Sequence, residues 1–146
     1  MSDNDDILNS IKSSFQSALD IVETKKNIEC EIRNIISLIK ESTSDVVYAE
    51  IGNPDILKRS LPSYSEVFNY DNAIILKSNA NKSTYYFLCV YSLNKSTGFP
   101  VLIRYKNEEF SCNTADILKI TLKNILTSPE TAMAMANLFN GKEADY

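Results

Sequence analysis

Histidine is absent from this 146-residue sequence, and glycine and cysteine number only three each. Without histidine the chain cannot form a Ser-His-Asp or Cys-His nucleophile system or a histidine-ligated zinc site, and it lacks the commonest general base. Three scattered cysteines cannot supply a four-thiolate zinc site. No Walker loop and no dinucleotide fingerprint occurs in the sequence. We therefore expect a non-enzyme with no cofactor and no metal site.

The number and spacing of the cysteines also indicate the redox environment in which the protein is found. Cys30, Cys89 and Cys112 do not form an even set, and none belongs to a Cys-x-x-Cys pair, which is typical of a reducing environment. The first residues lack the basic start and apolar core of a signal peptide, and no apolar run approaches membrane-spanning length. We expect a cytoplasmic protein with no membrane partner. The high content of isoleucine, lysine and asparagine is typical of AT-rich genomes and favours a bacterial or phage source.

The longest apolar run rich in β-forming residues is Thr84–Leu93. As a strand it has two faces: Tyr85/Phe87/Cys89/Tyr91/Leu93 and Tyr86/Leu88/Val90/Ser92. Both are mostly apolar, so the strand should lie inside a sheet with both faces at least partly covered. We expect Phe87, Leu88, Val90 and Ile103 to be buried. The tetrapeptide Asn-Lys-Ser-Thr stands at 81–84 and again at 94–97 and predicts a turn at each end of the strand.

The N-terminal part of the chain predicts a helix. Residues 1–5 form a polar tail, and the helical pattern runs over 6–42. One stripe reads Ile7, Ile11, Ser14, Ala18, Ile21, Lys25, Ile28, Ile32, Ile35 and Ile39, and a second reads Leu8, Phe15, Leu19, Val22 and Ile36. Thr24–Asn27 interrupts both, so the segment is either one helix or two antiparallel helices that break there. Because no glycine or proline marks a break, we favour the single helix.

The rest of the chain predicts an antiparallel sheet followed by helices. Residues 46–112 read as a meander of four to five strands, with a long connection over 52–71. Residues 114–140 read as two helices, the second opened by Ser128-Pro129-Glu130. The expected fold is α+β, with a long N-terminal helix, an antiparallel meander and two C-terminal helices packed on one face. We expect a single domain over 1–146.

Charge is unevenly distributed along the chain. The formal net charge is −6 over residues 1–55, +5 over 56–107 and −3 over 108–146. The simpler interpretation is that acidic helices and a basic sheet neutralise each other. The alternative is a basic, tyrosine-rich surface for an anionic partner, in which aromatic rings stack on bases and lysines hold phosphates.

Several short patterns have a possible chemical reading. Ser37–Lys40 and Ser92–Lys95 match the spacing of a Ser-x-x-Lys pair, although such a match arises readily by chance. A metal-dependent nuclease site would need acidic residues near a lysine, and the candidates are Asp71 with Lys77, or Glu108 and Glu109 with Lys106. We interpret these acidic residues more simply as parts of turns. The long connection holds the residues that we expect to bind a partner. They are Lys58, Arg59, Tyr64, Phe68 and Tyr70.

The length of the predicted helix favours an oligomer. A helix of about 35 residues is roughly 50 Å long, whereas ten extended residues span only about 33 Å. Part of the isoleucine stripe would then face water, which predicts a homodimer or a protein partner on the N-terminal helix. We expect Ile28, Ile32, Ile35 and Ile39 to form the interface, with Lys25 in the stripe setting its register.

These observations favour a non-catalytic protein-binding module of the immunity-protein, inhibitor or secretion-chaperone type. The first alternative is a nucleic-acid-binding module that uses the basic 56–107 segment. The second is a small metal-dependent hydrolase.

Overall fold

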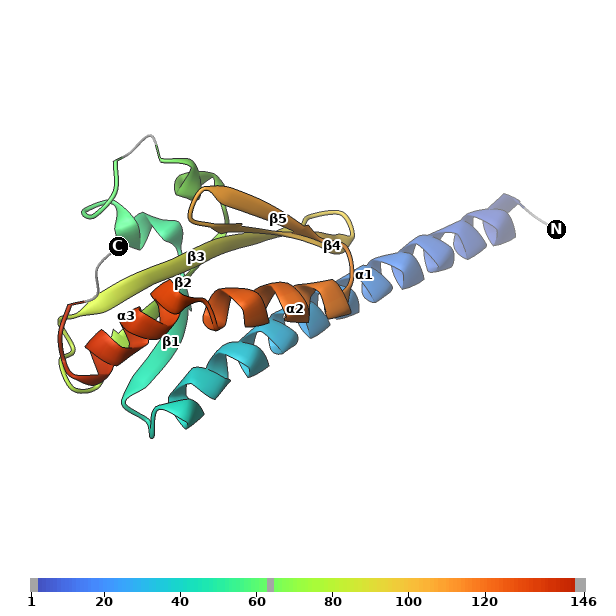
Figure 1. The fold of residues 1–146 in the computed structure, drawn as a ribbon. Coiled ribbons are helices and arrows are strands. Elements are labelled where there is room, and N and C mark those ends of the chain that lie inside the picture. Colours follow the sequence, from blue (N-terminus) through green and yellow to red (C-terminus); the bar gives the residue numbers. More distant parts are fainter. Residues whose placement is uncertain (1–2, 63–64, 144–146) are drawn as a thin grey trace.

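A computed structural model describes residues 3–62 and 65–143 and confirms the α+β fold (Figure 1). A long N-terminal helix precedes five antiparallel strands, and two helices follow them. The strands lie in the order β1-β2-β3-β4-β5, so the sheet is a simple meander. The elements are α1 (Asp3–Ser42), β1 (Val47–Gly52), β2 (Asn72–Ser78), β3 (Tyr85–Asn94), β4 (Gly98–Tyr105), β5 (Glu108–Cys112), α2 (Ala115–Leu126) and α3 (Pro129–Phe139).

Helix α1 is a single uninterrupted helix of 40 residues. It passes through Thr24–Asn27 without a break, which confirms the single-helix alternative. The Thr24 hydroxyl donates to the carbonyl of Asp20 one turn earlier, so this polar residue stays within the helical pattern. The predicted tail over 1–5 is wrong for residues 3–5, because the helix already begins at Asp3. Acidic residues in this first turn are favoured by the positive end of the helix dipole.

All three helices pack on one face of the sheet (Figure 1). The C-terminal half of α1 contributes Ile28, Ile32, Ile36 and Ile39 to this core. Helix α2 contributes Leu118, Leu122 and Ile125, and α3 contributes Ala134 and Leu138. The pattern of apolar residues at spacings of three and four therefore brings one side of each helix onto the same sheet surface.

The connection over 52–71 covers part of the other face of the sheet. It forms two 3-10 turns, Pro54–Leu57 and Glu66–Asn69. Leu57 and Val67 are buried against Ala73, Ile75 and Val90 in a second, smaller cluster. Each face of the sheet is thus at least partly covered, as the apolar strand Thr84–Leu93 indicated.

A bulge in β3 changes which of its residues share a face. Ile74 of β2 lies opposite Cys89, but the next residue, Ile75, lies opposite Phe87, so Leu88 is the extra residue. Leu88 and Cys89 consequently both join the helix-side core. The strictly alternating faces predicted from the sequence are therefore wrong. The helix side holds Tyr86, Leu88, Cys89, Tyr91 and Leu93, and the other side holds Tyr85, Phe87 and Val90. Of the four residues expected to be buried, Leu88, Val90 and Ile103 are, whereas Phe87 is half-buried.

The two copies of Asn-Lys-Ser-Thr form the same local structure. The side-chain oxygen of Asn81 accepts from the backbone N–H of Ser83, and that of Asn94 accepts from the N–H of Ser96. Each asparagine therefore closes a turn beside one end of β3, as predicted.

Gly98 lets the β3–β4 turn approach α1 closely. Its φ is +88°, and a Cβ at this position would lie 3.2 Å from both Ile28 Cδ1 and Thr24 Cγ2. We expect Gly98→Ala to lower the free energy of unfolding by roughly 1–3 kcal/mol, because alanine is strained in this conformation and meets the helix. Urea unfolding measures the change.

Gly52→Ala is the matched control. A Cβ there would meet only the flexible end of Ile56 at 3.2 Å, and no positive φ is involved. We expect it to change stability by less than about 1 kcal/mol. Equal losses in the two variants would contradict a tight contact between α1 and the turn.

Candidate protein-binding site

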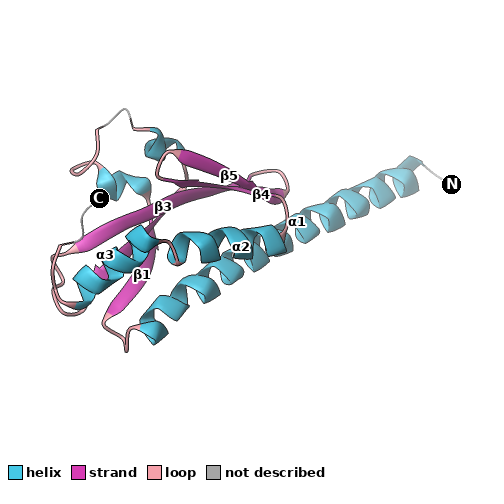
Figure 2. Ribbon diagram, viewed as in Figure 1, coloured by secondary structure: helices cyan, strands magenta, loops and turns pink. Residues whose placement is uncertain are grey.

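The N-terminal half of α1 extends beyond the sheet into solvent (Figure 2). Residues 3–20 are all exposed, and the first buried residue of the helix is Ile28. We call residues 3–23 the overhang. At about 1.5 Å per residue it is roughly 30 Å long.

Six of the large apolar side chains on the overhang are exposed, and each of these six keeps between 44% and 63% of its surface in water. They are Ile7, Leu8, Ile11, Phe15, Leu19 and Val22, which we call the overhang stripe. Residues three or four apart share one side of a helix, so these six form a continuous band. Single exposed apolar residues are ordinary, but a contiguous group on one element is typical of an interface.

The oligomer interface predicted from the sequence lies in the wrong half of the helix. Ile28, Ile32 and Ile39 are buried in the chain's own core, with exposed fractions between 1% and 4%, and Ile35 is half-buried beside them. They contact the sheet and the other helices and are not available to a second protein. The expectation that part of the stripe faces water is met by Ile7 and Ile11 in the N-terminal half.

Polar contacts mark the place where α1 leaves the sheet. Lys25 Nζ donates to the carbonyl oxygen of Lys95 at 2.5 Å, and the buried Tyr91 hydroxyl donates to Glu29 Oε2 at 2.9 Å. Burial of Tyr91 and the adjacent Glu29 carboxylate raise the pKa of its phenol above the usual range. Lys25 thus binds the chain's own β3–β4 turn, so its predicted role in setting the register of an interface is wrong.

The residues predicted for partner binding lie at two separate places on the 52–71 connection. Lys58 and Arg59 are exposed at the end of the first 3-10 turn, where Lys58 pairs with Asp55 at 3.5 Å. Phe68 and Tyr70 are half-buried against the second core cluster. Tyr64 lies outside the described residues. The four described residues are therefore two exposed cations and two aromatic side chains that serve the chain's own second cluster.

Tyr70 has a structural contact of its own. Its hydroxyl donates to Glu109 Oε2 of β5. Partial burial, followed by this hydrogen bond and the charge of Glu109, raises the pKa of Tyr70 to about 12. The side chain is therefore used to hold the connection against the sheet edge.

Ion pairs neutralise much of the basic 56–107 segment. Lys77 pairs with Glu50, Arg104 with Glu66, and Lys106 with Glu130 of α3, at 2.6 to 3.1 Å. Of these three, the Lys106–Glu130 pair joins the basic segment to a C-terminal helix, as the simpler interpretation of the charge pattern expects, whereas Arg104–Glu66 lies within the segment and leaves its net charge unchanged. The observed pairing leaves the nucleic-acid alternative with less of the positive charge on which it depends.

The serines of the two Ser-x-x-Lys patterns make ordinary structural hydrogen bonds. The Ser37 hydroxyl donates to the carbonyl of Asn34 at 2.7 Å within α1, and that of Ser92 accepts from the backbone N–H of Asp71. Within residues 3–62 and 65–143, no group of three acidic or cysteine side chains is placed to hold a metal ion.

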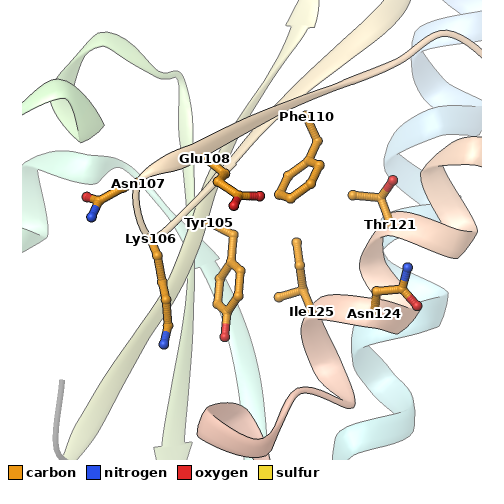
Figure 3. Close-up of a pocket in the computed structure, with 8 residues that line it drawn as sticks. All are labelled: Tyr105, Lys106, Asn107, Glu108, Phe110, Thr121, Asn124 and Ile125. Atoms are coloured by element: carbon orange, nitrogen blue, oxygen red, sulfur yellow. The ribbon is translucent and has the colours of Figure 1, made fainter.

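A hollow of about 520 Å³ lies between the β4–β5 hairpin and α2 (Figure 3). Tyr105, Phe110 and Ile125 supply much of its apolar wall. Two of its polar groups already have partners, because Lys106 pairs with Glu130 and the Tyr105 hydroxyl bonds the Ser128 hydroxyl. The hollow therefore offers shape, the Glu108 carboxylate and the amide groups of Asn107 and Asn124, which is a weaker sign of a site than the overhang stripe.

No protein-family model matches this chain, and no curated protein and no solved structure shows a significant match to it. Among the described residues, no helix combines the length and apolar character that a membrane span requires.

The two halves of α1 should respond differently to truncation. Ile32→Ala removes a fully buried side chain and should cost roughly 2–5 kcal/mol of unfolding free energy. Ile11→Ala removes a side chain that is 60% exposed and should change stability by less than about 0.5 kcal/mol. Urea unfolding at high dilution tests the pair, and similar losses would contradict the assignment of Ile11 to the overhang.

The Tyr91–Glu29 hydrogen bond should make stability fall in alkaline solution. The phenol keeps its proton in the folded chain, while in the unfolded chain it ionises near pH 10. Its contribution is therefore complete below pH 10 and declines as the pH rises toward the folded pKa. We expect Tyr91→Phe to lose stability at pH 8 but to show a shallower decline between about pH 10 and 11. Parallel declines in the two proteins, measured by urea unfolding, would contradict this.

Proposed function

We propose that this chain is a non-catalytic protein-binding module, of the immunity-protein, inhibitor or secretion-chaperone type, which docks through the overhang stripe. The observation that carries the proposal is a helix half that projects from the sheet with six large apolar side chains in one band. The general type follows from class-level analogy with small, acidic, histidine-free domains.

The energetics favour a bound partner. Full burial of one such side chain stabilises an assembly by roughly 1.5–3 kcal/mol, so several together would outweigh much of the entropy lost on association. The helix is already formed, which reduces the ordering cost. Leu8, Ile11, Phe15 and Val22 have the spacing by which a helix inserts into a groove of another protein.

The charge of the overhang favours a protein partner over a lipid surface. Helices that lie on membranes carry lysine and arginine on the polar face, which attract anionic lipids. The overhang instead carries Asp3, Asp5, Asp6, Asp20 and Glu23 against the single cation Lys12. An anionic bilayer would repel this helix, while a protein groove with a neutral or basic rim would accept it.

A capture experiment with matched variants tests the proposal. The wild-type chain and an Ile11→Glu/Phe15→Glu variant are each expressed in the source cell, purified under mild conditions and analysed by mass spectrometry. We expect the wild type to retain a defined polypeptide, either a different protein or a second copy, in fixed ratio. The double variant should lose it because two charges would have to be buried in the interface.

Ile120→Glu is the control, since Ile120 is 58% exposed on α2, away from the overhang. It should retain the polypeptide. Circular dichroism should show that all three proteins are folded, because the altered residues are exposed. Equal retention by the wild type and the Ile11→Glu/Phe15→Glu variant would overturn the proposed docking element.

A further inference from the structure

We infer that the free edge of β1 is a second binding site, which takes an extended acidic segment of a partner protein as a sixth strand of the sheet. The site uses none of the overhang residues and goes beyond the docking proposed for them. The inference follows from the unpaired backbone of β1, from the groove between this edge and α1, and from the positive charge along that groove.

β1 is an outer strand of the sheet, so only one of its two sides pairs with another strand (Figure 1). The backbone N–H of Asn79 donates to the carbonyl of Val46, which is a hydrogen-bonded pair just before the ladder with β2. Because hydrogen-bonded and non-bonded pairs alternate in an antiparallel ladder, every second residue after Val46 bonds β2. The residues between them turn their backbone groups to the free side, and they are Val47, Ala49 and Ile51.

The chain's own side chains satisfy only the first of these three residues. The N–H of Val47 donates to Thr43 Oγ1 at 3.0 Å, and the Thr43 hydroxyl contacts the Val47 carbonyl oxygen at 2.9 Å. Within residues 3–62 and 65–143, the backbone groups that Ala49 and Ile51 turn to the free side have no hydrogen-bond partner. The N–H and C=O groups of both residues are therefore available to an added strand.

A groove of about 440 Å³ lies between this edge and the C-terminal half of α1. One wall is the segment 48–51 of β1. The other wall consists of four residues from one side of the helix, which are Arg33, Ile36, Ser37 and Lys40. An added strand would pair with β1 and lie along this side of α1. The groove therefore gives an extended segment both backbone partners and a surface for its side chains.

The charges that line the groove favour an acidic segment. Arg33 and Lys40 are exposed on the helix wall, and neither forms an ion pair with another described residue. Glu50, the acid among the lining residues, pairs with Lys77 of β2 at 2.8 Å. The groove thus presents two cations that the chain does not pair, although the chain as a whole carries a formal charge of −4.

Acidic residues beside the groove leave these cations available. Glu29, one turn before Arg33, accepts from the Tyr91 hydroxyl. Glu41 and Asp45 follow Lys40 in the chain and are exposed. None of these three acids forms an ion pair with either cation, and none lines the groove. The charge that an added strand would meet is therefore positive.

The direction of the side chains defines the segment further. Ala49 and Ile51 face the helix side of the sheet, where they pack against the main core. Residues paired across two strands share a face, so the two residues opposite them in an added strand would face α1. Carboxylates at these alternate positions would reach Arg33 and Lys40. We therefore expect aspartate or glutamate at every second position, with β-branched residues between them.

The same charges disfavour other pairings of the sheet. If two copies of the chain joined their β1 edges, Arg33 and Lys40 of each copy would approach those of the other, which is repulsive. The opposite edge of the sheet is β5, which carries the exposed acids Glu108 and Glu109. An acidic segment would be repelled there, so the two edges of one sheet differ in what they accept.

Titration with a defined peptide tests the charge of the site. The probe is a fluorescent Thr-Glu-Val-Glu-Val-Glu-Thr peptide with blocked ends, and we expect saturable binding to the full chain. Arg33→Glu/Lys40→Glu should weaken binding by at least about tenfold at low salt and by less at high salt. Lys82→Glu/Lys95→Glu is the control, because it makes the same change in net charge outside the groove. It should leave the dissociation constant within about twofold of the wild-type value.

Amide hydrogen exchange tests strand addition directly. The bound peptide should slow exchange at the N–H groups of Ala49 and Ile51 and leave Tyr48 and Glu50, which already bond β2, unchanged. Ala49→Pro removes an N–H that faces the free side and leaves the bonds to β2 in place, so it should abolish peptide binding in a folded chain. Ala49→Val keeps the N–H and should retain binding.

Several results would overturn the inference. They are an absence of saturable binding at millimolar peptide, equal weakening by the two charge-reversal variants, and binding without protection of the Ala49 and Ile51 amides. Protection of these amides without peptide, in a dimer that Ala49→Pro dissociates, would make a second copy the occupant instead. The Ile11→Glu/Phe15→Glu variant should bind the peptide as the wild type does, so this site and the proposed function can fail separately.

Discussion

The structure depends on how α1 is held at its midpoint. The buried Tyr91 hydroxyl donates to Glu29, Lys25 donates to the β3–β4 turn, and Gly98 lets that turn lie against the helix. Lys25 and Thr24, which take part in these contacts, belong to the polar segment that interrupts the apolar stripe. On one side of them the stripe is core, and on the other it is open to solvent. One helix is thereby divided into a half that folds the chain and a half that is available for binding.

This division also explains why the overhang can remain helical without a partner. An isolated helix of about 20 residues is marginal in water because its first turn is costly to form. Here the buried half supplies the nucleus, so the overhang only extends an existing helix. The first-turn acids and the hydrogen bond from Gln16 to Asp20 add local support. A preformed helix loses less conformational entropy on binding, which favours its use as a docking element.

The sequence predicted the fold more completely than the site. Hydrophobic periodicity identified one long helix, the meander and the two C-terminal helices, because those patterns report which face of each element is apolar. Periodicity does not report which neighbour covers that face. Ile28 and Ile32 were therefore assigned to an oligomer, although the comparison of helix length with strand length correctly indicated that part of the stripe would be left over. That comparison gives the excess length but not the end at which it lies.

The bulge in β3 was a further limit on prediction. Two adjacent apolar residues, Leu88 and Cys89, face the same side, and strict alternation does not anticipate this. The error matters for the site because the bulge keeps Tyr91 on the helix side, where it reaches Glu29. Similarly, net charges of segments indicated neutralisation but did not identify the pairs, such as Lys106 with Glu130, which depend on elements that are distant in the sequence.

The arrangement separates the residues that stabilise the fold from those of the surface proposed for recognition. The remaining exposed apolar residues are distributed over different elements, with Ile120 on α2 and Met133 on α3, whereas those of the overhang share one helix face. Substitutions in the overhang stripe change a solvent-exposed surface without creating a cavity in the core. Substitutions at Ile32 or Tyr91 act on the core and reach the overhang only through the position of α1. The midpoint contacts therefore separate the half of α1 whose residues must fit the core from the half whose residues face solvent. The sheet holds the buried half and so sets the direction in which the overhang points.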